Sequence, residues 1–170
     1  MKLITYEESD KLIKLLHNDY QEDVNITLMH SNLNALFTML KPKHLKNIDL
    51  MCIYNFIRYN TLGLQAENNI YLFLHNFKNL DERASVQELR LLAAKTLFHE
   101  IRHIYQQRYK AHKIVDDYIF ELGNGYLAQW DERDANHFAF RMMNKHKEDI
   151  NKILDISFDW EIIWETLYIK

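Results

Sequence analysis

A long helical pattern from Ser85 to about Tyr109 constrains the fold of this chain more than any other segment. Ser85 followed by Glu88 fits a capping box, in which each side chain accepts a hydrogen bond from the other residue's backbone N–H at the start of a helix. The pattern predicts a long helix with one apolar side, around which the rest of the chain must pack. Its apolar positions, at helical spacing, are Leu89, Leu92, Leu97, Ile101 and Ile104.

Few residues elsewhere in the chain break regular secondary structure. The 170 residues include 3 glycines and 1 proline, while 48% are hydrophobic and 26% are charged. A chain of this length suits a single domain with its own hydrophobic core. We therefore expect one α+β domain over residues 1–170, dominated by helices, with its motif-bearing core at about 70–145.

Apolar patterns on both sides of the long helix predict further elements. The run Ile70–Leu74, bounded by asparagines, is typical of a buried strand, and we expect a small sheet that includes it beside the long helix. A helix at about 158–169, packed on the core, is predicted by helical spacing of Trp160, Ile163, Trp164 and Leu167. The other predicted elements are helices at Glu7–Tyr20, Leu33–Leu40 and Asp131–Lys145, a strand at Val24–Met29, and an apolar segment at 48–59 that favours a buried helix over a strand.

The charges and the apolar runs argue against several classes of protein. The net charge is −3 and the charged residues are scattered, so we expect no direct binding to nucleic acid. No run approaches the ~18 apolar residues of a membrane-spanning helix, and the first residues turn acidic before any hydrophobic region develops. The one cysteine, Cys52, fits a buried apolar role in a reducing compartment. These features predict a cytoplasmic protein without membrane contact.

The stretch His99-Glu100-Ile101-Arg102-His103 carries the clearest chemistry in the chain. On a helix, His103 lies only about 40° around the axis from His99 and one turn along, so both imidazoles can reach one metal ion. Glu100 points in a neighbouring direction, where it can address a water without binding the metal. Imidazole and carboxylate ligands suit zinc, and a glutamate beside the zinc can act as general base.

A third ligand is available downstream, beyond the glycine cluster Gly123–Gly125. Glu132 lies near the start of the predicted helix Asp131–Lys145, so a turn through the glycines can bring it across the first helix. Asp134 is the main competitor for this role, and a solvated surface cluster of charges is the structural alternative.

The two motifs together resemble the gluzincin type of zinc metallopeptidase. H-E-x-x-H followed by E-x-x-A-x-x-F-A is most similar to the ImmA/IrrE-like group, and the likeness covers roughly residues 70–143. It implies a zincin-like fold in which His99, His103 and Glu132 bind Zn²⁺. It also implies that Glu100 is the catalytic acid/base. By the same resemblance, Asn136 is expected to hydrogen-bond a ligand histidine from outside the metal shell. Arg102 is a departure, because the group commonly has glycine at that position. The packing positions of the second motif are Ala135, Phe138 and Ala139.

The resemblance also implies a function and a setting. Enzymes of this group tend to cleave a specific regulatory protein, so we expect hydrolysis of a peptide bond in a protein such as a transcriptional repressor. The small size fits a protease encoded by a phage or mobile element. The edge of the small sheet would bind the extended substrate by strand addition. Two alternatives stay open: a non-catalytic interaction protein on a zincin scaffold, and a zinc hydrolase of a non-peptide substrate.

A tyrosine is a candidate donor to the oxyanion of the tetrahedral intermediate. Tyr118 and Tyr126 lie in the segment that connects the two motif helices, from which they could approach the metal. Tyr105 and Tyr109 are further candidates on the long helix, and with 10 tyrosines in the chain none is singled out.

Overall fold

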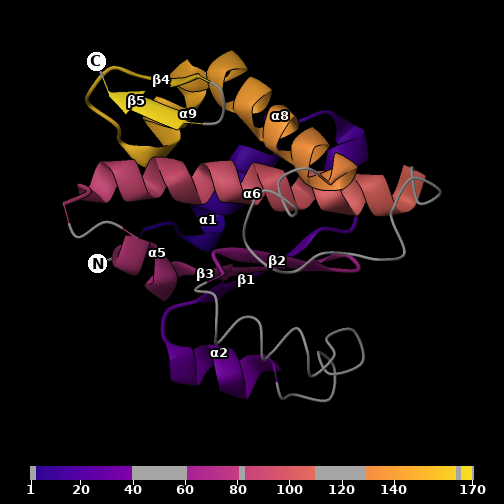
Figure 1. Ribbon diagram of the computed structural model, residues 1–170. Coiled ribbons are helices and arrows are strands. Elements are labelled where there is room, and N and C mark those ends of the chain that lie inside the picture. The colour runs from indigo at the N-terminus through magenta and orange to yellow at the C-terminus, as the bar shows by residue number, and fades with distance from the viewer. Residues whose placement is uncertain (1–2, 40–60, 81–82, 110–128, 164–165, 170) are drawn as a thin grey trace.

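Helix α6 (Val86–Tyr109) runs through the middle of the molecule, between a helical layer and a sheet, as the computed structural model shows (Figure 1). The structure describes residues 3–39, 61–80, 83–109, 129–163 and 166–169. On one side of α6 lie α8 (Trp130–Lys145) and α9 (Lys147–Leu154), and on the other lies the sheet. The fold is α+β and dominated by helices, as the sequence predicts.

A three-stranded mixed sheet faces α6. Its order is β1 (Asn25–Met29), β3 (Asn69–Phe73), β2 (Gly63–Ala66), with β1 parallel and β2 antiparallel to β3. Ile70 and Leu72 of β3 join the main core, whereas Tyr71 and Phe73 pack into a smaller cluster on the opposite face. Because β3 is buried on both faces, its sequence is continuously apolar rather than alternating. The predicted strand and its place beside the long helix are confirmed.

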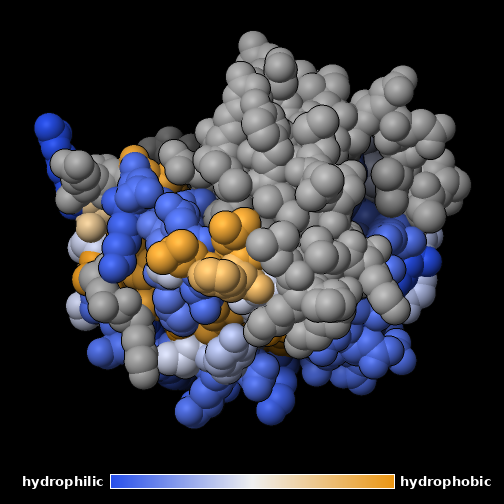
Figure 2. Space-filling model, turned by 90° about the horizontal axis from the view of Figure 1, so that it is seen from below, coloured by the Kyte–Doolittle hydropathy of each residue, from blue (hydrophilic) through white to orange (hydrophobic). Residues whose placement is uncertain are grey.

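The smaller cluster is covered by helix α2 (Asn32–Met39), which lies on the far side of the sheet (Figure 1). Seen from that side, the surface carries an apolar patch among hydrophilic residues (Figure 2). Leu33 and Phe37 of α2 are each 67% exposed there. This short helix thus buries only part of its apolar surface against the sheet, through Ala35 and the partly buried Leu36.

Two capping boxes begin helices at the places where the sequence contains them. Thr5 and Glu8 form one at the start of α1 (Tyr6–Ile13), and Ser85 and Glu88 exchange the same pair of hydrogen bonds before α6. Glu8 also accepts a hydrogen bond from Arg90 at 2.6 Å, which ties α1 to α6.

One predicted helix is shorter than expected, and several elements of the structure were not predicted. The first helix ends at Ile13, earlier than the predicted Tyr20, and a 3₁₀ turn follows at Asn18–Tyr20. The strand at Val24–Met29 and the helices starting near Leu33 and Asp131 are confirmed within the described residues. Strand β2 and the helices α5 (Leu74–Leu80) and α9 were not predicted. The segment 48–59, with Cys52, lies outside the described residues.

The predicted C-terminal helix at 158–169 is wrong. This segment forms an antiparallel pair, β4 (Trp160–Ile163) and β5 (Thr166–Ile169). Trp160 and Ile162 are buried while the residues between and after them are not, so the burial follows the period of two typical of a strand. Trp160 also donates its indole N–H to Asn151 of α9 at 2.7 Å, which fixes β4 on the helical layer.

No helix among the described residues is long and apolar enough to cross a membrane.

Candidate metal centre

The two histidines of the first motif lie one turn apart on the side of α6 that faces α8. Their Nε2 atoms are 3.0 Å apart, and their rings meet edge to face. Helix α8 packs closely across α6 because its inward positions include the small residues Ala135 and Ala139, both fully buried. This close approach brings the first turn of α8 over the histidines.

Glu132 completes the group from that first turn. Its side chain is 1% exposed, with Oε2 3.2 Å from His99 Nε2 and Oε1 3.4 Å from His103 Nε2. One ligand atom from each of the three residues lies within 4.8 Å of the others, so the group could hold a metal ion. The structure thus brings together the three residues that the sequence predicts as ligands.

The hydrogen bonds of the two imidazoles fit a metal between them. Nδ1 of His99 lies 3.0 Å from Oδ1 of Asn136, and Nδ1 of His103 lies 2.8 Å from Oε1 of Gln106. With each amide oxygen facing the ring as it does here, each Nδ1 donates the hydrogen bond, and each neutral ring keeps a lone pair on Nε2. Two lone pairs that face each other beside a carboxylate repel unless a cation lies between them. The donor set of two imidazoles and one carboxylate matches zinc.

Charge complementarity within the metal-free group shifts two pKa values. Burial alone would raise the pKa of Glu132, but hydrogen bonds from His103 and His99 outweigh it and hold the pKa well below its usual range. Burial alone would lower the pKa of His103, but the hydrogen bond to Glu132 and the charges of Glu100 and Glu132 raise it to about 9. A proton on His103 therefore takes the place of a cation when no metal is bound.

Glu100 lies on the other flank of the histidines, under strand β2. Its side chain is buried, and burial raises its pKa although the two neighbouring histidines lower it. The backbone N–H of Gln65 donates a hydrogen bond to its carboxylate. A Cβ atom added at Gly63 would lie 2.5 Å from Glu100 Oε1, so a glycine is what lets β2 approach this close. From the sequence Gly63 was interpreted only as a turn residue, whereas it begins β2, and Gln65 was not singled out.

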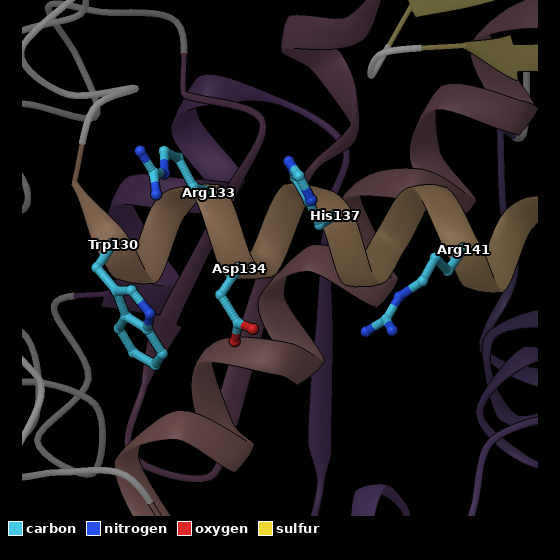
Figure 3. A pocket seen from close by; sticks show the side chains of 5 residues that line it. All are labelled: Trp130, Arg133, Asp134, His137 and Arg141. Atoms are coloured by element: carbon cyan, nitrogen blue, oxygen red, sulfur yellow. The ribbon is translucent and has the colours of Figure 1, made fainter.

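Asp134, the competing ligand, does not join the metal group. Its carboxylate accepts two hydrogen bonds from Arg102, at 2.7 and 3.0 Å. Figure 3 shows Asp134 pointing from α8 toward the neighbouring helix, whereas Arg133 and His137 point the opposite way. Asp134 lines a pocket together with the other four residues labelled in Figure 3, and none of the three ligand candidates is among them.

Gln106 is a buried residue of the site that was not expected. It stands three residues after His103, which places it one turn further along the same side of α6. Its spacing from His103 was the only signal in the sequence, because the burial of Gln106 becomes known only from the structure.

Of the tyrosines considered as oxyanion donors, some pack against other aromatic rings and others lie outside the described residues. Tyr105 stacks on Tyr20 with ring centroids 4.6 Å apart and lies 4.7 Å from the ring of Tyr109. These contacts give Tyr105 a packing role on α6. Tyr118 and Tyr126 lie outside the described residues.

Comparison with known proteins gives no relative: no family model, no curated protein and no solved structure matches the chain. The likeness to gluzincins therefore stays a prediction from the two motifs.

Proposed function

We propose that this chain is a zinc-dependent peptidase. The observation that carries the proposal is the convergence of His99, His103 and Glu132 from two helices, with the buried Glu100 beside them. A purely structural zinc site needs no buried glutamate next to its ligands, so Glu100 favours catalysis over a scaffold role.

The residues divide the work of hydrolysis among them. His99, His103 and Glu132 would hold Zn²⁺, which supplies a Lewis acid for the scissile carbonyl and for the attacking water. Glu100 takes the proton of that water and later gives it to the leaving amine. The raised pKa of Glu100 suits both steps, because the carboxylate of a buried glutamate holds a proton more readily.

Strand β2 offers a place for an extended substrate. Phe73 N–H donates to Leu62 O, so in this antiparallel pair residues 62 and 64 bond to β3. The backbone groups of Gly63 and Gln65 then face the outer edge of β2, which pairs with no other strand among the described residues and where the Gln65 N–H bonds to Glu100. A peptide added to this edge would run past the general base, which supports a protein substrate. A regulatory protein such as a repressor is the substrate that the motif resemblance implies.

The first experiment measures metal content by mass spectrometry on the purified wild type, His99→Ala, Glu132→Ala and Glu100→Gln. We expect about one zinc per wild-type chain, its loss in the two ligand variants and its retention in Glu100→Gln. His137→Ala, on the outer side of α8, is the matched control and should keep its zinc. A wild type that is folded and metal-free would contradict the proposal.

The second measurement separates the peptidase from the two alternatives. Wild type and Glu100→Gln are assayed on a panel of folded and unfolded proteins and on small amide and ester substrates. We expect peptide cleavage that falls about 100-fold or more in Glu100→Gln. Hydrolysis of the small substrates alone would favour the non-peptide hydrolase. Zinc binding without any turnover would favour the interaction scaffold.

A further inference from the structure

We propose that Gln106 is a positioning residue for His103, and that the buried Arg102–Asp134 pair holds Gln106 in the required orientation. The inference rests on the proposed metal site and extends it to residues outside the ligand set. It assigns a role to Arg102, the residue between the motif glutamate and the second histidine.

Gln106 lies between His103 and helix α8 and is 1% exposed. Its Oε1 atom is 2.8 Å from His103 Nδ1. Its Nε2 atom donates to the backbone oxygen of Asp131 and to Oδ2 of Asp134, both at 2.9 Å. The side chain thus uses both ends of its amide in contacts between the two motif helices.

These contacts leave only one orientation of the amide. The backbone oxygen of Asp131 and the carboxylate of Asp134 are acceptors, so the NH₂ group of Gln106 must face them. The amide oxygen must then face His103, which makes Nδ1 the protonated nitrogen of that ring. The lone pair is left on Nε2, the atom that faces His99 Nε2 and Glu132. The network therefore selects the tautomer that binds a metal through Nε2.

Arg102 holds the carboxylate of Asp134 in the position where it accepts the hydrogen bond from Gln106. Its guanidinium forms the two hydrogen bonds to the carboxylate and donates a third, at 2.5 Å, to the hydroxyl of Tyr20. The guanidinium carbon lies 4.8 Å from the ring centre of Tyr105 and 5.2 Å from that of Phe138. A planar cation held by two aromatic rings and a bidentate partner has little freedom to rotate. The charge of Asp134 is therefore fixed opposite the NH₂ group of Gln106.

His99 has a simpler partner. Its Nδ1 contacts Asn136, and no second contact of that amide among the residues described here fixes which way it points. We therefore expect the two histidines to depend unequally on their amide partners, with the larger dependence at His103.

The test measures the affinity of the protein for Co²⁺ by competition with a chelator, together with the visible absorption spectrum of the Co²⁺ protein. Gln106→Met keeps the size of the side chain and removes the acceptor, so we expect 10–100-fold weaker binding and a changed spectrum. Gln106→Glu keeps an acceptor for His103 but sets its second oxygen against Asp134, so it is combined with Asp134→Asn, whose amide can donate to it. This double variant should bind at least tenfold more tightly than Gln106→Met. Gln107→Met, the same change at the exposed neighbour, should stay within about twofold of the wild type.

A second variant tests the outer step without emptying the buried position of Gln106. Asp134→Asn gives this position a side chain that can donate as well as accept a hydrogen bond. The amide of Gln106 can then rotate by half a turn, and we expect Co²⁺ binding about threefold to tenfold weaker. Unfolding curves establish that each variant is folded.

The outcomes separate this inference from the proposed function. If the wild type binds Co²⁺ and Gln106→Met binds it equally well, or if Gln106→Met and the double variant Gln106→Glu with Asp134→Asn are weakened equally, the positioning role is wrong while the metal site stands. If the wild type binds no Co²⁺, the metal site is wrong and the positioning role is overturned with it.

Discussion

Helix α6 is held differently on its two flanks, and both flanks reach the same site. Toward α8, next to the buried alanines, charged and amide side chains make the contacts around the histidines, with the Arg102–Asp134 pair and Gln106 between the helices. Toward the sheet the contact is close packing, with the backbone of β2 against Glu100 and a glycine at the nearest point. The α8 flank positions the two histidines of the candidate metal group, and the β2 flank positions Glu100, the proposed general base.

The difference indicates what kind of change each flank tolerates. Hydrogen bonds and ion pairs depend on which groups are present, so the α8 flank should be sensitive to loss of charge or of an acceptor. Close packing depends on volume, so the β2 flank should be sensitive to one added methyl group and tolerant of polar changes at exposed positions. Variants that remove a charged group on the α8 flank or add a methyl group on the β2 flank test this comparison.

The largest expected effect is on the α8 flank. Arg102→Met removes the cation, keeps the apolar stem of the side chain and leaves the carboxylate of Asp134 without its bidentate partner. The arginine side chain is 8% exposed, so we expect a loss of about 3 kcal/mol in the free energy of unfolding, measured by urea titration. Asp134→Asn and the double variant complete the cycle. The two single losses should sum to more than the loss in the double variant, and simple additivity would show that the pair is not coupled.

The second effect concerns pH and the metal-free protein. The pKa of His103 is raised to about 9 when no metal is bound, so the stability it contributes is complete below its ordinary pKa of 6.5 and is lost as the pH rises to about 9. The lowered pKa of Glu132 acts in the opposite sense, with stability present above 4.5 and lost as the pH falls. In the presence of a chelator, we expect the free energy of unfolding to fall by about 2 kcal/mol between pH 6 and pH 9. Glu132→Gln should flatten this profile, and an unchanged profile would contradict the assignment.

The smallest effect on stability is expected on the β2 flank. Gly63→Ala places a methyl group 2.5 Å from Glu100 Oε1 and 2.8 Å from Thr96 Cγ2, so either the edge strand or Glu100 must move. We expect about 1 kcal/mol of lost stability because an edge strand shifts easily, but a fall of about tenfold or more in turnover with zinc retained. Ala66→Gly, which removes a methyl group from the same strand, is the matched control. Equal turnover in Gly63→Ala and the wild type would show that β2 does not position Glu100.

Much of the fold and of the ligand group follows from local patterns. The capping box at Ser85 could be predicted because its hydrogen bonds form within four consecutive residues; the box at Thr5 has the same spacing but was not singled out. The apolar run in β3 is readable because both faces of that strand are buried. The candidate ligands could be predicted because two of them lie one helical turn apart and the third belongs to a motif on one further helix.

The parts that were not predicted depend on contacts between distant segments. The residues from Trp160 onward have apolar spacing compatible with either period, and the choice of a strand pair is made by packing on α8 and α9. Gly63 is readable as a turn residue, but its approach to Glu100 arises only when the sheet packs on α6. In the same way, the role of Gln106 appears only when α8 supplies its two acceptors.

The pairing of the sheet has a consequence for the order of folding. Strands β2 and β3 are joined by the tight turn Glu67-Asn68, with Glu67 in the left-handed region at φ 52°, so their pairing closes only a short loop. Strand β1 pairs with the other edge of β3 in parallel, and the whole chain from 30 to 68 lies between the two strands. Loop closure over that distance costs more entropy and is slower. We expect β2, β3 and α6 to assemble first and β1 to join afterwards, so that weakening β1 speeds unfolding more than it slows folding.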